Sequence, residues 1–239
     1  MPLHSIHVLP TGARLGLWHL RETAAELWPL LPAGPHYRPL LPITNDLTRQ
    51  AQWLASRVLL HELLAAFQSS LPLPATTELW LTNAPDGQPQ LAGWPGAAVS
   101  LSHSGEWVAA LLAPSGRAGI DVELVRDKAR RLATRFLADE ELAAARQGAP
   151  DSVIFTLLWS TKETLYKLAG QRGLAFREHI LTEPFSEPIL AFATGALAAT
   201  LHRASGQTRH LVCYTEPAPG YVLTYCHEPA EFSRTSLSP

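Results

Sequence analysis

Two short stretches of the chain have residues that could do chemistry: "GIDVEL" at 119–124 carries two carboxylates, and "WSTKETLYKL" at 159–168 combines one carboxylate with two lysines. Alternate side chains of a β-strand share a face, so Asp121 and Glu123 are predicted to point the same way while the residues between them point into the core. Adjacent carboxylates repel each other, which is tolerated at a solvated edge or relieved by a hard divalent cation, Mg²⁺ or alternatively Mn²⁺. Asp-x-Glu is a common pattern, and both interpretations stay open.

The second stretch places two of the three lysines of the chain beside Glu163. On a helix Glu163 and Lys167 are one turn apart and lie nearly opposite the apolar stripe, with Trp159 beside them. An exposed salt bridge would be worth only about 0.3–0.5 kcal/mol. Alternatively, Glu163 is a third metal carboxylate and Lys167 contacts a phosphate that the metal also touches. The predicted apolar stripe consists of Ile154, Leu157, Leu158, Thr161, Leu165 and Leu168.

A third candidate is the corner "SLSHSGEW" at 100–107. Small hydroxyl residues and glycine between a strand and a turn leave donors that can face an anion, and His103 adds a donor whose charge depends on pH. A purely structural corner, in which Ser102 and its neighbours cap the turn, explains the same residues.

The elements that must position these residues follow from local patterns. Strands are predicted over 97–101, 107–112 and 118–125, with helices over 128–147 and around 159–168 separated by a break at 148–152. Residues 208–216 and 221–228 read as a hairpin. Earlier in the chain, a short strand is predicted at 6–8, a helical piece at 21–30, and a short strand before the Pro-Asp-Gly turn at 85–87.

The strongest helix signal covers 45–67, where Asn45 or Asp46 can cap the start. Arg49, Trp53 and Arg57 recur at four-residue steps and share one flank. This flank fits a solvated arginine edge as well as an anion-binding surface.

Composition limits the class of protein. A chain of 239 residues with 46% hydrophobic residues can bury a substantial core. The net charge of −2 and a pI near 6.5 give no basic surface for nucleic acid or an acidic membrane. Without a secretory leader pattern or roughly 18 consecutive apolar residues, we expect a cytoplasmic protein. Cys213 and Cys226 are expected to be free, buried thiols rather than a disulfide or zinc ligands.

The order of elements contains few helical crossovers of the βαβ kind, which favours an α+β fold. We expect two halves, 1–115 and 116–230, with the metal and transfer motifs in the second half. Residues 231–239 are expected to be a disordered tail.

Together these motifs resemble a known family. "LSHSGEWVAALLAPSGRAGIDVEL" followed at a distance by "WSTKETLYKLAG" resembles the Sfp-type 4'-phosphopantetheinyl transferases, whose signatures are a Ser-His-Ser corner, Gly-[Ile/Val]-Asp-x-Glu and Trp-[Ser/Ala]-x-Lys-Glu-x-x-x-Lys. The combination in this order is highly specific, although each piece is not. The resemblance is clear from about 86 to 175, weaker around Trp53, and thin in the first forty residues.

The resemblance implies a monomer of two similar α+β halves related by a pseudo-two-fold, each a small antiparallel sheet packed with helices, with coenzyme A and Mg²⁺ in the cleft between them. It also implies transfer of the phosphopantetheine arm of coenzyme A to a serine of an apo carrier protein, releasing adenosine 3',5'-bisphosphate. The carrier would be an acyl, peptidyl or aryl carrier protein of fatty acid, polyketide or nonribosomal peptide synthesis.

The site residues implied by the resemblance follow from the matched motifs. Asp121, Glu123 and Glu163 match the metal carboxylates, and Lys167 matches the lysine that meets the phosphates of coenzyme A. Ser102 and His103 match the corner that receives the 3'-phosphate. Glu163, Lys167 and Asp121 are therefore the candidate catalytic residues, with Glu163, directly or through water, a candidate base for the incoming serine.

The chain departs from the family in its N-terminal half. Where many relatives have Gly-Lys-Pro before the corner, this chain has Gly87, Gln88 and Pro89. One cationic phosphate contact is therefore missing, and Gly87 and Gln88 themselves are candidates for binding coenzyme A. The basic residues expected from the N-terminal helix are reduced to arginines, and Arg49 and Arg57 are the candidates.

Two other functions use the same residues. A Mg²⁺-dependent phosphohydrolase would release inorganic phosphate without a carrier protein. A binding protein would hold a nucleotide or a carrier domain without turnover, although the retained acids and Lys167 argue against it.

Overall fold

The computed structural model describes residues 3–68, 79–85, 87–147, 152–184 and 194–230. The predictions of a disordered tail at 231–239, of a break within 148–151 and of Asp86 in a turn lie outside the described residues.

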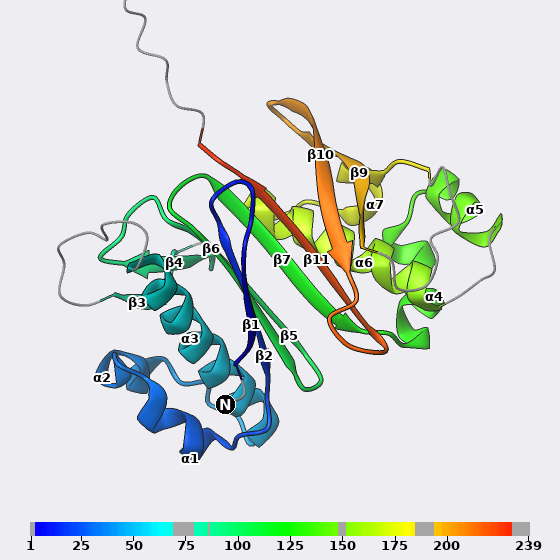
Figure 1. The fold of residues 1–239 in the computed structure, drawn as a ribbon. Coiled ribbons are helices and arrows are strands. Elements are labelled where there is room, and N and C mark those ends of the chain that lie inside the picture. Colours follow the sequence, from blue (N-terminus) through cyan, green and yellow to red (C-terminus); the bar gives the residue numbers. More distant parts are fainter. Residues whose placement is uncertain (1–2, 69–78, 86, 148–151, 185–193, 231–239) are drawn as a thin grey trace, which may run out of the picture.

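The first sheet has four antiparallel strands: β1 (Leu3–Val8), β2 (Arg14–His19), β6 (Trp107–Ala113) and β5 (Ala98–Ser104), in that spatial order. β6 lies between β2 and β5, and all of its residues are buried. Helix α3 (Leu47–Gln68) covers one face of this sheet (Figure 1). The remaining elements of this region are short: α1 (Ala24–Leu27), η1 (Trp28–Leu30), α2 (Gly34–Tyr37), η2 (Arg38–Leu40), β3 (Trp80–Asn83) and β4 (Pro89–Ala92).

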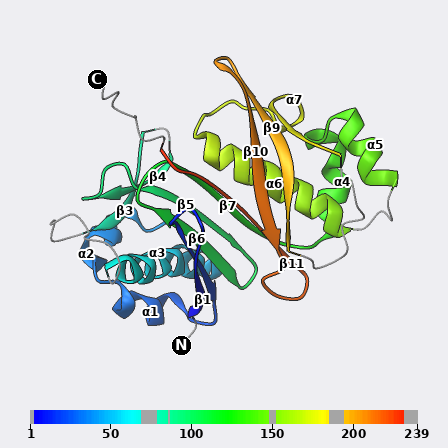
Figure 2. The same ribbon diagram turned by 45° about the horizontal axis from the view of Figure 1, so that its top comes forward.

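The second sheet has five antiparallel strands: β7 (Arg117–Leu124), β11 (Tyr221–Glu228), β10 (Gly206–Thr215), β9 (Gly195–Arg203) and β8 (Ile180–Thr182), again in spatial order. Its helices are α4 (Asp127–Phe136), α5 (Asp139–Gln147), α6 (Ser152–Ala169) and α7 (Phe176–His179). Figure 2 shows α6 lying behind β9 and β10.

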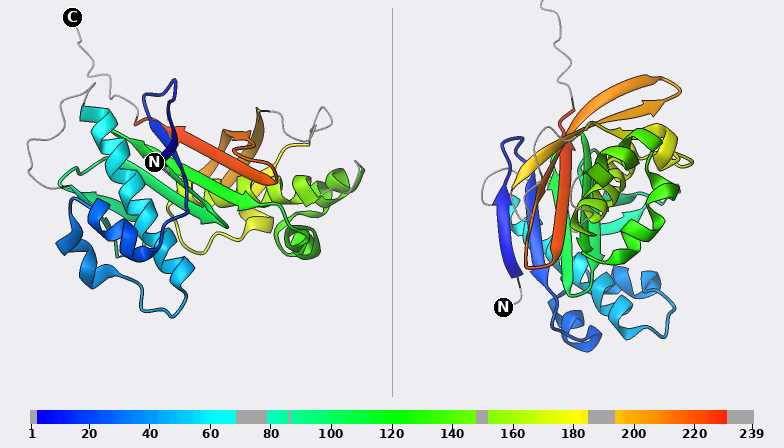
Figure 3. Two further views of the ribbon diagram at one scale, coloured as in Figure 1. Left: turned by 60° about the horizontal axis from the view of Figure 1, so that its bottom comes forward. Right: turned by 90° about the vertical axis from the view of Figure 1, so that its right-hand side faces the viewer.

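The apolar clusters arrange these elements in four layers. One cluster lies between α3 and the first sheet, and a second joins the other face of that sheet to β7 and β11. A third lies between the far face of the second sheet and α6. The two sheets therefore meet through one apolar face each, and α3 and α6 cover their other faces. Figure 3 shows these elements from two further sides.

This layering assigns the two faces of β7. Ile120 and Val122 are buried in the apolar layer between the sheets. The alternate residues Gly119, Asp121 and Glu123 face the α6 side. The prediction that the two acids share one face of a strand is confirmed.

The structure confirms the α+β class and places β5, β6, β7, β10 and β11 close to the predicted strands. The helix predicted over 128–147 is wrong in one respect, because α4 and α5 are separate helices. Leu137 takes an extended conformation (φ −99°, ψ 138°), and the carboxylate of Glu141 accepts the N–H of Ala138 at 2.7 Å. This side chain satisfies a donor at the start of α5 and favours the break. Strands β2 and β9 were not predicted.

The first sheet draws all its strands from residues 3–113 and the second from 117–228. The pseudo-two-fold relation between two halves stays a prediction. Cys213 and Cys226 are free, as predicted, but only Cys226 is buried, so the prediction of a buried thiol is wrong for the half-buried Cys213. Within the described ranges, no helix is both long and apolar enough to cross a membrane.

Candidate active site

The edge strands of the two sheets, β5 and β7, lie side by side and are joined through serine hydroxyls. Ser100 Oγ accepts the N–H of Ile120 at 3.0 Å, and Ser104 Oγ accepts the N–H of Leu124 at 3.1 Å. Alternate residues of a strand share a side, so Ser100, Ser102 and Ser104 all meet β7. We call these three residues the serine seam.

The serine seam also holds the two acids of β7. Ser102 Oγ donates to Asp121 Oδ1 at 2.9 Å, and Ser104 Oγ donates to Glu123 Oε2 at 3.1 Å. The structural role of the Ser-His-Ser corner is therefore real, although it joins two strands rather than only capping a turn. Binding of a 3'-phosphate by Ser102 stays a prediction.

Helix α6 lies directly on the acid-bearing face of β7. Gly119 is required there, because a Cβ at this position would collide with the carbonyl oxygen of Thr164. The helix is fixed further by Thr224 Oγ1, which donates to the carbonyl oxygen of Ser160 at 2.9 Å and lies 2.7 Å from Thr164 Oγ1. This close contact brings Glu163 and Lys167 to the acids of β7.

Lys167 pairs with a strand acid. Its Nζ donates to Asp121 Oδ1 at 2.8 Å and to the carbonyl oxygen of Ile120 at 2.9 Å. The Asp121 side chain is only 5% exposed and that of Lys167 is 27% exposed. Of the carboxylates that the structure describes, Asp121 is the ion-pair partner of Lys167, so the interpretation as an exposed pair with Glu163 is wrong.

The three acids are close enough to influence one another's ionisation. Burial, followed by the charge of Asp121, raises the pKa of Glu163 to about 7, while Lys167 opposes this shift. Burial and the charge of Asp121 also raise the pKa of Glu123, whose Oε1 accepts the indole N–H of Trp159 at 3.1 Å. Three mutually repelling carboxylates in a poorly hydrated place are typical of a functional site.

The fit of this group to a metal ion is partial. Asp121 Oδ2 is buried and has no hydrogen-bond partner among the described residues, which suits an oxygen ligand for a hard cation. No three His, Cys, Asp or Glu side chains within the described ranges already stand as a metal-ligand set. Metal ligation by Asp121, Glu123 and Glu163 therefore stays a prediction.

Three cations act on His103, the residue between Ser102 and Ser104. Partial desolvation of the His103 ring, followed by the charges of Lys167, Arg49 and Arg57, lowers the pKa of His103. His103 is nevertheless exposed, and so is Arg49. Three basic residues thus lie within electrostatic reach of His103, which favours an anion over a second cation here.

The two arginines of α3 differ in their surroundings. Asp46 Oδ1 accepts the backbone N–H of Arg49 at 3.1 Å, which confirms Asp46 as the cap of α3. Arg57 is buried, its Cζ lies 3.7 Å from the centre of the Trp53 ring, and burial lowers its pKa to about 10. A solvated edge therefore describes Arg49 but not Arg57.

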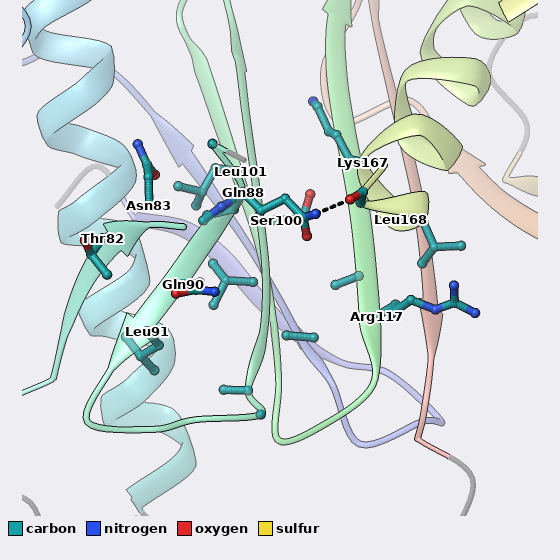
Figure 4. A pocket seen from close by; sticks show the side chains of 18 of the residues that line it. Thr82, Asn83, Gln88, Gln90, Leu91, Ser100, Leu101, Arg117, Lys167 and Leu168 are labelled. Carbon is teal, nitrogen blue, oxygen red and sulfur yellow. Dashed lines mark hydrogen bonds between the residues drawn. The ribbon is translucent and has the colours of Figure 1, made fainter. Parts of the chain in front are cut away.

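A cavity of about 980 Å³ opens beside Lys167. Figure 4 shows residues of β3 to β5 along one side of this cavity and the end of α6 with the start of β7 along the other. Gly87 and Gln88 line it, and Gln88 Nε2 donates to the carbonyl oxygen of Gly170, so these two candidates lie at the junction of the two sides. Lys167 is the residue common to the cavity and to the acid group.

The sequence analysis missed the role of Lys162. Its side chain is fully buried, and Nζ donates to Glu141 Oε2 at 2.6 Å and to the carbonyl oxygen of Ile180 at 2.5 Å. The spacing held a signal, because Lys162 is four residues after Leu158 and three before Leu165, on the buried face of α6. Lys162 therefore anchors the helix directly before Glu163.

Comparison with known proteins relates this region to a family. Residues 117–226, which contain β7, α6 and the three acids, match the family model of the 4'-phosphopantetheinyl transferase superfamily. This match confirms the resemblance drawn from the motifs.

Individual proteins that are similar to this chain are also named 4'-phosphopantetheinyl transferases. The 4'-phosphopantetheinyl transferase AcpT of Salmonella typhimurium (strain LT2) is 32% identical over 126 residues, which cover 51% of this chain and 60% of the relative. AcpT of Escherichia coli (strain K12) is 30% identical over 129 residues, covering 51% and 59%. The 4'-phosphopantetheinyl transferase psf-1 of Bacillus pumilus is 32% identical over 133 residues, covering 55% and 53%. The chain thus spans somewhat over half the length of these relatives.

Proposed function

We propose that this protein transfers the 4'-phosphopantetheine arm of coenzyme A to a serine of an apo carrier protein and releases adenosine 3',5'-bisphosphate. The match of residues 117–226 to the superfamily model supports the reaction class. The observation that carries the proposal is the position of Glu163, a carboxylate with a pKa of about 7 beside Asp121 and Lys167. A base of this pKa is matched to proton transfer near neutral pH.

In the proposed reaction, the serine oxygen attacks the phosphorus atom on the pantetheine side of the pyrophosphate. A new serine O–P bond forms, and the bond to the oxygen of the nucleotide phosphate breaks. Glu163 accepts the hydroxyl proton, directly or through water, and the bisphosphate leaves as an anion. No covalent intermediate on the enzyme is needed.

Lys167 contributes positive charge where the phosphates would lie. Its ammonium group donates a hydrogen bond to Asp121 Oδ1 at 2.8 Å. A phosphate that approaches from the adjoining cavity competes for the same ammonium group, which can donate up to three hydrogen bonds.

The acids Asp121, Glu123 and Glu163 would hold a Mg²⁺ ion, for which Mn²⁺ is the alternative. Such an ion supplies charge neutralisation of the pyrophosphate when bound. The buried Asp121 Oδ2 supports the choice of Asp121 as one ligand. Ser102 orients Asp121 by donating to its Oδ1, and Ser104 orients Glu123 by donating to its Oε2.

The test is incubation of the purified protein with coenzyme A, Mg²⁺ and several apo carrier proteins of the acyl, peptidyl and aryl classes. Transfer adds about 340 Da to the carrier, the mass of the transferred group, which intact-mass spectrometry detects. A mass unchanged with every carrier class would contradict the proposal. Release of inorganic phosphate without a carrier would instead identify a phosphohydrolase.

A further inference from the structure

The charged residues that line the cavity are all cationic. Of the residues described around it, Arg117, Lys167 and Arg172 carry positive charge, and the lining contains no Asp or Glu. Lys167 pairs with Asp121 at 2.8 Å, and Arg117 pairs with Glu228 at 3.0 Å. A cavity lined in this way attracts an anionic ligand.

Arg172 lies where the two sides of the cavity meet. It is an exposed residue on the loop that follows α6, between Gly170 and Gly173, which both have positive φ. A Cβ built on Gly87 would lie 3.0 Å from Nη2 of Arg172, so the guanidinium group lies against the backbone of Gly87 at the start of the β4 side. A loop of the second half thus places a cation beside a backbone segment of the first.

Gln88, the residue that follows Gly87, cannot supply a positive charge at this junction. Gln88 is neutral, and its Nε2 donates to the carbonyl oxygen of Gly170. Gly170 has room for the amide only because it lacks a Cβ, which would lie 2.6 Å from Gln88 Nε2. Gln88 therefore links the two sides of the cavity while Arg172 provides the positive charge.

We infer that Arg172 binds a phosphate group of coenzyme A at this junction. Lys167, which is bonded to Asp121, does not reach this side of the cavity. This inference rests on the proposed function. A guanidinium group can hold a phosphate through two parallel hydrogen bonds, which a glutamine amide cannot reproduce in charge. The lysine missing at position 88 is thereby replaced from another loop.

The experiment measures binding of coenzyme A to the full chain by calorimetry, with Mg²⁺, for wild type, Arg172→Gln and Arg172→Lys. Loss of one charge-assisted phosphate contact should weaken binding by about 10- to 100-fold for Arg172→Gln, while Arg172→Lys, which keeps the charge but not the two parallel hydrogen bonds, should weaken binding less. The affinity of the variant Arg172→Gln should also depend less steeply on salt. Pantetheine, which has no phosphate, should bind all three proteins equally.

A second pair of variants tests the replacement itself. Adding Gln88→Lys to Arg172→Gln should restore part of the affinity, because the cation returns to the same junction from the other side. The matched control is Arg130→Gln, since Arg130 is an exposed arginine paired with Asp127 on α4 and should bind as wild type.

The outcomes separate the two claims. Equal affinity of Arg172→Gln and wild type, in a protein that binds coenzyme A and modifies a carrier, would overturn the role of Arg172 alone. A wild-type protein that binds no coenzyme A would overturn the proposed function and this inference with it. Thermal unfolding of each variant shows whether a loss of affinity reflects a loss of fold.

Discussion

Lys167 Nζ lies 2.8 Å from Asp121 Oδ1, and this contact joins the last turns of α6 to the middle of β7. The same carboxylate oxygen accepts the hydroxyl of Ser102 from β5. One acid therefore connects the edge strands of both sheets and the helix above them. Its other oxygen, Oδ2, is buried without a described hydrogen-bond partner.

In this arrangement, carrier modification should be sensitive to the loss of negative charge at Asp121 or at Glu163. We expect Asp121→Asn and Glu163→Gln each to lower carrier modification by about 100-fold or more, because one loses the carboxylate beside Lys167 and the other the proposed base. The measurement is the rate of the mass increase of the carrier. Circular dichroism should show an unchanged fold, since both changes are isosteric.

Glu140→Gln is the matched control for these variants, because Glu140 is an exposed carboxylate on α5. It should modify the carrier at the wild-type rate. Near-normal turnover of both Asp121→Asn and Glu163→Gln would refute the assignment of the acid group.

The ionisation of Glu163 can be measured directly. In the metal-free protein its carboxyl should titrate at about pH 7, because burial and the charge of Asp121 disfavour the ionised form. Carbon-13 NMR of labelled glutamate, assigned with Glu163→Gln, would follow this titration. Lys167→Met should raise the pKa further, since Lys167 lowers it.

Addition of Mg²⁺ should lower the pKa of Glu163, because a nearby cation favours the carboxylate. A pKa that does not respond to saturating Mg²⁺ would remove Glu163 from the proposed metal site. Below the pKa of Glu163 in the protein with Mg²⁺, the protonated carboxyl cannot accept a proton, so transfer should slow as the pH falls through that value.

Gly119 offers a test of the helix contact. Gly119→Ala should destabilise the protein by about 3 kcal/mol, because the added methyl group meets the backbone oxygen of Thr164 and α6 must move away from β7. Urea unfolding measures this loss. Gly34→Ala is the control, since a Cβ at Gly34 has nothing within 4 Å and should leave stability nearly unchanged. Equal stability of the two variants would mean that α6 does not lie this close to β7.

The buried pair of Lys162 and Glu141 gives a separate prediction. Lys162→Met should cost about 3–5 kcal/mol of unfolding free energy, because the carboxylate of Glu141 stays buried without its cation. Adding Glu141→Gln should recover part of the loss, since the amide oxygen can still accept the N–H of Ala138 or Thr182. If the double variant is no more stable than Lys162→Met, the charge of Glu141 is not the cause.

Several features of the site were predictable because they depend on local periodicity. The alternation of β7 fixes Asp121 and Glu123 on one face, and the spacing of α6 sets Glu163 and Lys167 off its main apolar stripe. The motifs themselves led to the family. All of these follow from neighbours within one strand or one helix.

Other features depend on contacts between segments that are far apart in the sequence. Three contacts join residues that are at least 21 positions apart: Lys167 with Asp121, Lys162 with Glu141, and Gln88 with Gly170. Local pattern describes what each side chain can do but not which partner the tertiary fold brings to it. The interpretation of Glu163 and Lys167 as an exposed pair, which the helix spacing alone allowed, is wrong for this reason.

The serine seam has one more consequence. In an ordinary sheet, main-chain hydrogen bonds set the distance between neighbouring strands, and a side-chain substitution does not change one of these bonds by itself. Here hydroxyl groups hold the boundary between two sheets, so Ser100, Ser102 and Ser104 can each be changed while both ladders stay whole. The positions of Asp121 and Glu123 can thereby be altered by one serine substitution at a time.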